Sequence, residues 1–289
     1  MIALLLSVLS SSLIFVIFKL FARFNIDTFQ AIVINYFVAF IIGVSLYGDT
    51  WDPRCLEENS WIPYIVLCAF MFIGLFLVMG KSAQLNGIAS TSVAVKMSMA
   101  VSLLLMIVSY GESLNPLKIL GIVLAFIGVY LVSSTKGTKF NSSYKWMLVA
   151  LFIVSGGFDF ILNYIQNNHL ETLSPALFSA IGFGLAGIIG LVILIIQLIR
   201  KKTKFEYRNI IAGIALGIPN FFSIYLLLLS YKATGWADST VLAITNVSVV
   251  LLSALMGFAL FKEKATRMKL LGLLTAVGAI TALYIATLN

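Results

Sequence analysis

Ten apolar stretches, each about as long as a bilayer is thick, run through this chain in two sets of five. A helix that spans a membrane needs roughly 20 mostly apolar residues. The stretches cover residues 2–21, 28–47, 61–82, 88–109, 116–134, 145–166, 173–198, 209–230, 237–261 and 268–287. The pattern predicts an all-α membrane protein with ten transmembrane helices.

Composition excludes a soluble protein. Of the 289 residues, 61% are hydrophobic and 10% are charged, whereas a soluble domain must cover its outside with polar side chains. The net charge of +8 does not indicate a nucleic-acid partner, because the basic residues flank the apolar stretches, where they orient a membrane protein. We expect a multi-pass protein of the bacterial inner (cell) membrane, with the lipid bilayer as its surroundings.

Lysine and arginine concentrate on one side of the predicted bundle. The connections after the odd-numbered spans, with the adjoining helix ends, hold 15 of the 19 basic residues: Lys19, Arg23, Lys81, Lys136, Lys139, Lys145, Arg200, Lys201, Lys202, Lys204, Arg208, Lys262, Lys264, Arg267 and Lys269. The other side holds Arg54, Lys118 and Lys232, and only Lys96 lies within a span. By the positive-inside rule the rich side is cytoplasmic, and both termini face outward.

The two sets of spans also share a sequence pattern. Residues 87–93 (GIASTSV) open the fourth span much as residues 235–241 (GWADSTV) open the ninth. Because each set contains an odd number of spans, the second copy must be inverted in the membrane, the plan of many secondary transporters. We therefore expect two inverted five-helix repeats, over residues 1–135 and 144–289.

A glutamate at the exit of the fourth and ninth spans, followed by a helix with spaced glycines, resembles the EamA-type ten-helix carriers of the drug/metabolite transporter superfamily. The motif residues are Glu112 with Gly121 and Gly128, and Glu263 with Gly272 and Gly278. The resemblance covers the full chain. It implies a carrier that exports or imports a small metabolite, often an amino acid or a related compound, by alternating access through a central cavity between the repeats. It makes the glutamates structural signature residues. Each is expected at a solvated helix end, near Lys118 or Lys264.

Two charged residues lie at membrane depth, where a charge is costly unless it faces a polar interior or a partner. Lys96 is about eight residues into the fourth span, and Asp159 is about fourteen residues into the sixth, so their depths differ by under about 10 Å. In one interpretation they line the central cavity, where Lys96 binds an anionic group such as the carboxylate of an amino acid. In the other they form an ion pair that only fixes helix packing.

Further polar side chains within the spans are candidates for contact with the small-molecule substrate. Asn163 and Gln166 share a helical stripe with Asp159, at i+4 and i+7. Other candidates that should face inward are Asn35, Tyr36, Gln84, Asn220, Thr245 and Asn246. For each of them the alternative is a hydrogen bond between helices.

Other classes of membrane protein have less support. An intramembrane enzyme is not expected, because the sequence has no HExxH, GxSxG or paired aspartates and its one histidine lies in a connection. No metal or cofactor is expected either. A channel, a facilitator or a receptor-like protein is the alternative, although inverted repeats favour alternating access. Proton coupling, if present, would run through Asp159; if Lys96 keeps that carboxylate ionised, the chain would be a facilitator or an exchanger.

Overall fold

The computed structural model describes residues 1–47, 61–111, 115–133, 144–168, 175–201, 203–234 and 238–288. Within these ranges every regular element is an α-helix. The helices are α1 (Ile2–Arg23), α2 (Thr28–Tyr47), α3 (Ile62–Leu85), α4 (Ile88–Met97), α5 (Met99–Tyr110), α6 (Pro116–Ser133), α7 (Trp146–Asn168), α8 (Pro175–Ile199), α9 (Tyr207–Thr234), α10 (Asp238–Phe261) and α11 (Arg267–Leu288).

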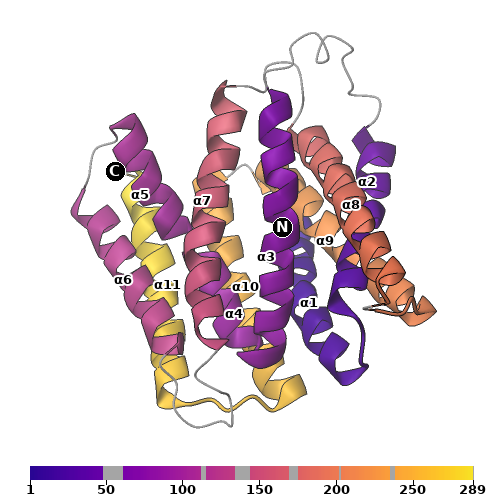
Figure 1. Ribbon diagram of the computed structural model, residues 1–289. Coiled ribbons are helices and arrows are strands. Elements are labelled where there is room, and N and C mark those ends of the chain that lie inside the picture. Colours follow the sequence, from indigo (N-terminus) through magenta and orange to yellow (C-terminus); the bar gives the residue numbers. More distant parts are fainter. Residues whose placement is uncertain are drawn as a thin grey trace.

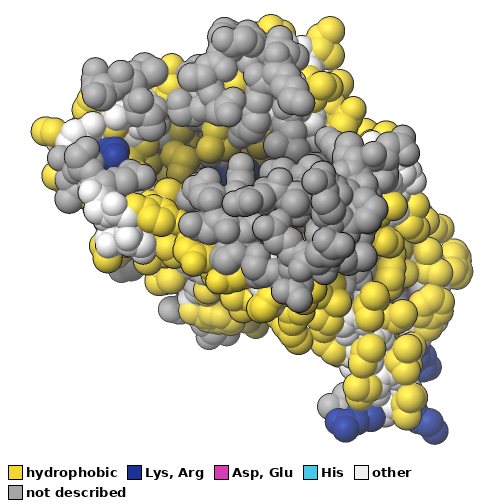
Figure 2. Space-filling model, turned by 90° about the horizontal axis from the view of Figure 1, so that it is seen from above, with side chains coloured by type: hydrophobic (Ala, Val, Ile, Leu, Met, Phe, Trp, Pro, Cys, Tyr) yellow, Lys and Arg dark blue, Asp and Glu magenta, His cyan; other side chains and the backbone are white. Residues whose placement is uncertain are grey.

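The helices have the length and composition of membrane spans. Among the described residues, nine segments are long and apolar enough to cross a bilayer, with α4 and α5 together forming one of them, and α7 adds a shorter apolar part over Trp146–Leu162. Large hydrophobic side chains are exposed around the bundle, and Figure 2 shows them over much of its flanks. The predicted all-α membrane architecture is confirmed.

The helices run side by side in a bundle to which both halves of the chain contribute (Figure 1). On one flank α6 packs along α11, and on the other α1 and α2 pack against α8 and α9. Helices α3, α4, α7 and α10 lie between these flanks. Nearly every extensive contact therefore joins a helix of the first half to a helix of the second.

One end of the bundle carries most of the described basic side chains. Here α1, α3, α8 and α10 finish and α4, α7, α9 and α11 begin, and we call it the basic end; it is the lower end in Figure 1. Its basic residues are Lys19, Arg23, Lys81, Lys145, Arg200, Lys201, Lys204, Arg208, Lys262, Lys264, Arg267 and Lys269. We call the other end the opposite end.

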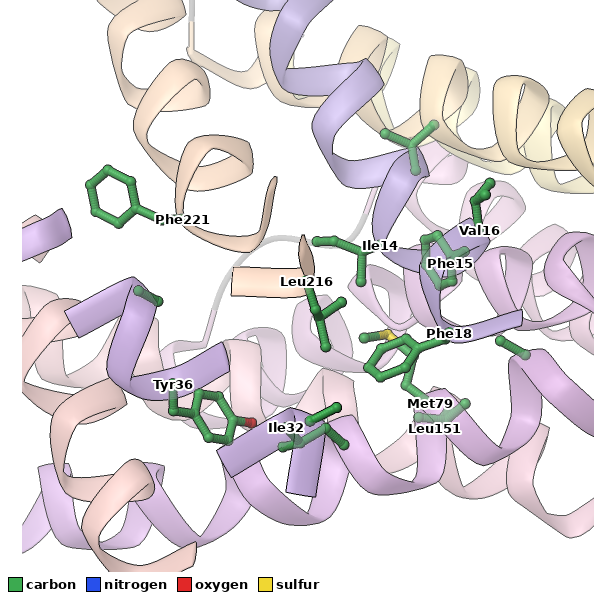
Figure 3. Packing of buried hydrophobic residues seen from close by; sticks show 14 of the residues in the cluster. Ile14, Phe15, Val16, Phe18, Ile32, Tyr36, Met79, Leu151, Leu216 and Phe221 are labelled. Carbon is green, nitrogen blue, oxygen red and sulfur yellow. The ribbon is translucent and has the colours of Figure 1, made fainter. Parts of the chain in front are cut away.

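The spaced glycines found in the sequence bring α6 and α11 into close contact. A Cβ added at Gly121 would lie 2.5 Å from Leu283 Cγ, and one added at Gly272 would lie 3.1 Å from the Gly128 carbonyl oxygen. In lipid, helices associate largely through such close van der Waals packing. On the other side of the bundle, α1, α2, α3 and α9 interlock through large buried side chains, among them Phe18, Ile32 and Leu216 (Figure 3).

Candidate functional site

The fourth span is interrupted near Lys96. The sequence predicts one continuous helix over 88–109, whereas the structure divides it at Ser98 into α4 and α5. The Ser98 hydroxyl donates a hydrogen bond to the Val95 carbonyl at 2.6 Å, and the Ser98 carbonyl accepts from the amides of Val101 and Ser102. A serine side chain bonded to its own turn competes with the regular helical ladder. As a result, Lys96 stands near the end of a short half-helix of ten residues.

Helix α7 lies directly against this interruption. A Cβ added at Gly156 would lie 2.6 Å from the Ser98 carbonyl oxygen and 2.5 Å from Val101 Cβ, so only glycine permits this approach. Asp159 follows about one turn later on α7. Its Oδ2 lies 3.3 Å from the Ser98 hydroxyl oxygen.

A cavity of about 490 Å³ lies between α3, α4, α5, α7 and α10. The charged residues that line it are Lys96 and Asp159. The remaining lining residues are the polar Ser98, Ser102, Ser155 and Asn246, the aromatic Phe72, Phe76 and Phe158, and the aliphatic and sulfur-containing Leu75, Met79, Val95, Met99, Met106, Leu151, Leu162 and Leu242. A mostly apolar wall with a few convergent polar groups is typical of a small-molecule site.

Lys96 and Asp159, one basic and one acidic, line the same cavity. Among the described residues, however, no ion-pair contact of 4.0 Å or less joins them. The Asp159 side chain is exposed within the cavity and Lys96 is partly exposed. An ion pair that only fixed helix packing would be in contact and shielded, so the arrangement favours two charges that are available to a ligand.

The other predicted residues divide into three groups. Asn246 lines the cavity, and its Nδ2 lies 3.8 Å from Met99 Sδ. Asn163 and Gln166 belong to α7, but their side chains are outside the described part of the structure, and their role stays a prediction. The third group is Asn35, Tyr36, Gln84, Asn220 and Thr245, and none of these lines the cavity just described.

Three members of the third group make hydrogen bonds elsewhere. The Tyr36 hydroxyl donates to the Phe72 carbonyl at 2.5 Å, which holds α2 against a helix that lines the cavity. Gln84 Nε2 donates to Thr28 Oγ1 at 2.9 Å, near the basic end. The Thr245 hydroxyl donates to the Val241 carbonyl of its own helix. The bonds of Tyr36 and Gln84 join two helices, as in the alternative given for them, whereas that of Thr245 stays within α10. Contact of these residues with a substrate stays a prediction.

Asn35 and Asn220 are buried among the described helices. The side-chain amide of Asn35 and the Asn220 Nδ2 have no hydrogen-bond partner there. Both lie on helices that contact each other, α2 and α9.

Several residues that line the cavity were not predicted from the sequence, although the spacing of some of them could have indicated it. Ser155 stands four residues before Asp159 and so extends the polar stripe predicted on α7. Ser98 and Ser102 have the same spacing on the fourth span. No sequence pattern indicated the aromatic residues Phe72, Phe76 and Phe158, because aromatic side chains are common throughout the chain.

Toward the basic end, a closely packed layer separates the cavity from the surface. Ser82, Ala83, Ile88, Ala89 and Thr91 are all at most 1% exposed. The hydroxyls of Ser82 and Thr91 also share a hydrogen bond of 2.8 Å across the α3–α4 turn. Asp159 itself is exposed, so among the described residues the close packing lies on the side of the cavity toward the basic end.

Glu263 lies beneath this layer in a buried cluster. Its side chain is 7% exposed, and its carboxylate oxygens lie 3.9 Å from Lys19 Nζ and 3.5 Å from Lys269 Nζ. The predicted solvated position of Glu263 is therefore wrong. The reason is local: Lys262, with φ +50°, reverses the chain after α10, and the Glu263 amide bonds back to the Gly257 carbonyl. This turn directs the carboxylate into the bundle.

A helical membrane bundle that encloses a charged, solvent-accessible cavity between its two halves has the architecture of a membrane transporter. The model of the EamA-like transporter family matches residues 1–134 and again residues 141–285, and the chain belongs to this family. The resemblance drawn from the glutamate and glycine motifs is thereby confirmed.

Two individual proteins are similar to this chain over nearly its whole length. An uncharacterized protein of Haemophilus influenzae is 27% identical over 288 residues, which are 96% of this chain and 96% of that protein. A protein of known crystal structure superposes with a TM-score of 0.63 at 13% identity, over 98% of this chain and 96% of the other. The second likeness concerns the fold alone.

Proposed function

We propose that this chain is a secondary-active transporter that moves a small metabolite bearing a carboxylate, such as an amino acid, through the cavity by alternating access. The observation that carries the proposal is the placement of Lys96 and Asp159 in one cavity without an ion-pair contact between them. Two charges held apart at membrane depth need a polar ligand or water to offset their desolvation.

The chemistry of the cavity suits such a substrate. The Lys96 ammonium can bind a carboxylate, and Asp159 can bind an amine or carry a proton. Ser98 orients the Asp159 carboxylate, and Asn246 offers one further donor and one further acceptor. The volume of about 490 Å³ lies within the range of small-molecule sites. The aromatic and methionine side chains would enclose the apolar part of the ligand.

A carrier fits the packing better than a channel does. A channel needs a continuous aqueous path, whereas the layer around Ser82 and Thr91 is closed toward the basic end. Closure at one end and access at the other is what alternating access requires of each of its states. We place the protein in the bacterial inner membrane with the basic end in the cytoplasm, from the distribution of lysine and arginine.

A thermal-shift screen of the purified protein tests this proposal. The ligands are amino acids, other carboxylates, amines and nucleotide derivatives, and the variants are Lys96→Met and, as a matched control, Lys81→Met, which removes an exposed lysine outside the cavity. We expect a carboxylate to stabilise the wild type and the Lys81→Met protein but not the Lys96→Met protein. The ligand found in this way should then show saturable counterflow in proteoliposomes.

Two outcomes would contradict the proposal. Equal stabilisation of the wild type and Lys96→Met by the same carboxylate would remove Lys96 from the site. Flux that rises linearly with concentration, without counterflow, would indicate a channel instead of a carrier.

A further inference from the structure

We infer that Glu263 is the latch that closes the cytoplasmic end of the cavity and that its release from α4 opens that end. The inference rests on the proposed transport function, and it identifies the contact that breaks when the cytoplasmic end opens. The latch consists of the Glu263 carboxylate, the first turn of α4, and the side chains of Lys19 and Lys269.

The central contact of the latch is a capped helix N-terminus. Glu263 Oε1 accepts a hydrogen bond of 2.7 Å from the amide of Ile88, the first residue of α4. The first amides of a helix have no partner within the helix, and its N-terminus favours a negative charge. Since Glu263 comes from the turn after α10, this bond joins the two halves of the chain.

Gly87 leaves room for the Glu263 carboxylate because it has no side chain. Its φ of +94° is unfavourable for a residue with a side chain, and a Cβ there would lie 2.6 Å from Glu263 Oε2 and 2.7 Å from Oε1. Gly257, one turn before the end of α10, is also close, since a Cβ there would lie 3.1 Å from Oε2. A side chain at position 87 would therefore expel the carboxylate from its site.

Two lysines on other helices form ion pairs with the Glu263 carboxylate. Lys19 of α1 lies 3.9 Å from Oε1 and also donates to the Gln84 carbonyl at 2.9 Å, and Lys269 of α11 lies 3.5 Å from Oε2. The lysine side chains are 17% and 12% exposed, so removal of Glu263 would leave two largely buried ammonium groups without their anionic partner. The cluster thereby ties α1 and the α3–α4 turn of the first half to α10 and α11 of the second.

The latch is connected to the cavity through α4. Glu263 holds the first residue of this half-helix, and Lys96, near its other end, faces the cavity. The interruption at Ser98 separates α4 from α5, so α4 can shift without moving the whole span. Displacement of α4 by a ligand at Lys96 would pull the Ile88 amide from Glu263 and open the packed layer at the basic end.

Cysteine labelling tests the latch without any knowledge of the substrate. In a background with Cys55→Ser and Cys68→Ser, the reporter is Ser92→Cys, one turn before Lys96 and fully buried. A second reporter, Ala180→Cys, lies buried on α8, which packs against α2 and α3, and it detects unfolding. A membrane-impermeant maleimide is applied to sealed vesicles from the side of the basic end.

We expect Glu263→Ala to raise the labelling rate of the Ser92→Cys reporter by about tenfold or more, because a charged helix cap is lost. Glu263→Gln, which keeps an acceptor for the Ile88 amide but not the charge, should give an intermediate rate. Gly87→Ala should behave like Glu263→Ala. Gly111→Ala is its matched control, because Gly111 also has a positive φ, +69°, but has open space around it; it should leave the rate unchanged.

Three results would overturn the latch. These are an unchanged rate in Glu263→Ala, an equal rise for Gly87→Ala and Gly111→Ala, or equal labelling of both reporters, which would make Glu263 a support of the fold instead of a gate. A failed ligand screen with the expected labelling pattern would count against the transport proposal and leave the latch standing, so the two failures can be told apart.

Discussion

The Ser98 hydroxyl oxygen lies 3.3 Å from Asp159 Oδ2, although the two residues are 61 positions apart in the chain. The same hydroxyl lies 2.6 Å from the Val95 carbonyl oxygen. Because a hydroxyl has a single proton, it can donate to that carbonyl or to the carboxylate, but not fully to both at once. Ser98 thus connects the interruption of the fourth span to the acid in the cavity.

Replacement of Ser98 by alanine should weaken ligand binding while the protein still folds. A hydrogen bond to a charged group contributes roughly 1.5–3 kcal/mol, so the loss in affinity should be about tenfold or more. The measurement is the ligand concentration that gives half the maximal thermal shift. An affinity equal to that of the wild type would show that the hydroxyl does not orient Asp159.

Asp159→Asn should lower counterflow by about tenfold or more, because a neutral amide leaves the Lys96 charge without its partner in the cavity. Asp27→Asn is a control at the basic end, where the carboxylate accepts from the amides of Phe29 and Gln30 and lies outside the cavity. We expect that control to change stability more than transport. Normal counterflow by correctly inserted Asp159→Asn protein would exclude Asp159 from the transport path.

Gly156→Ala should destabilise the protein by about 1–3 kcal/mol, because its Cβ would collide with the Ser98 carbonyl and force α7 away from the interruption. The neighbouring Gly157 is a matched control, since a Cβ there meets nothing within 4 Å. Gly157→Ala should be neutral or stabilising by up to about 1 kcal/mol. The comparison is made by thermal unfolding in detergent, and similar melting temperatures of the two variants would contradict the close packing of α7.

Asn209→Ala should destabilise the basic end by about 1–3 kcal/mol, because it leaves buried polar groups without partners. Asn209 Oδ1 accepts from the Asp27 amide at 3.0 Å, and its Nδ2 donates to Gln30 Oε1 at 2.9 Å. Ser45→Ala removes an exposed hydroxyl that bonds only within its own helix, and it should leave the melting temperature unchanged. Equal melting temperatures for the two variants would contradict the network.

The overall architecture could be predicted because the bilayer dictates it. Span length, the clustering of basic residues and the glycines that pack α6 on α11 are all local features of the sequence. The helices formed where these features placed them, except that the fourth span is divided at Ser98. The candidate site could be predicted only in part. Lys96 and Asp159 stood out because intramembrane charges are rare, but the interruption at Ser98 depends on the approach of Gly156 from the other half of the chain.

Glu263 shows the same limit. Its nearest basic neighbour in the sequence is Lys264, which favoured a solvated pair, yet the carboxylate turns inward to the Ile88 amide, 175 positions away. No local pattern contains that contact, because it arises from the way the two halves pack. Tyr36 and Gln84 are similar, since polarity alone did not separate hydrogen bonds between helices from a place in the cavity.

The most direct test of the central claim is the labelling of Ser102→Cys, a residue that lines the cavity, from each side of the membrane in the same background without other cysteines. We expect the reporter to react from the opposite end in the wild type and from the basic end in Glu263→Ala. A transported ligand should shift the two rates in opposite directions. Labelling from one side only under every condition, or rates from both sides that rise and fall together, would contradict alternating access through this cavity.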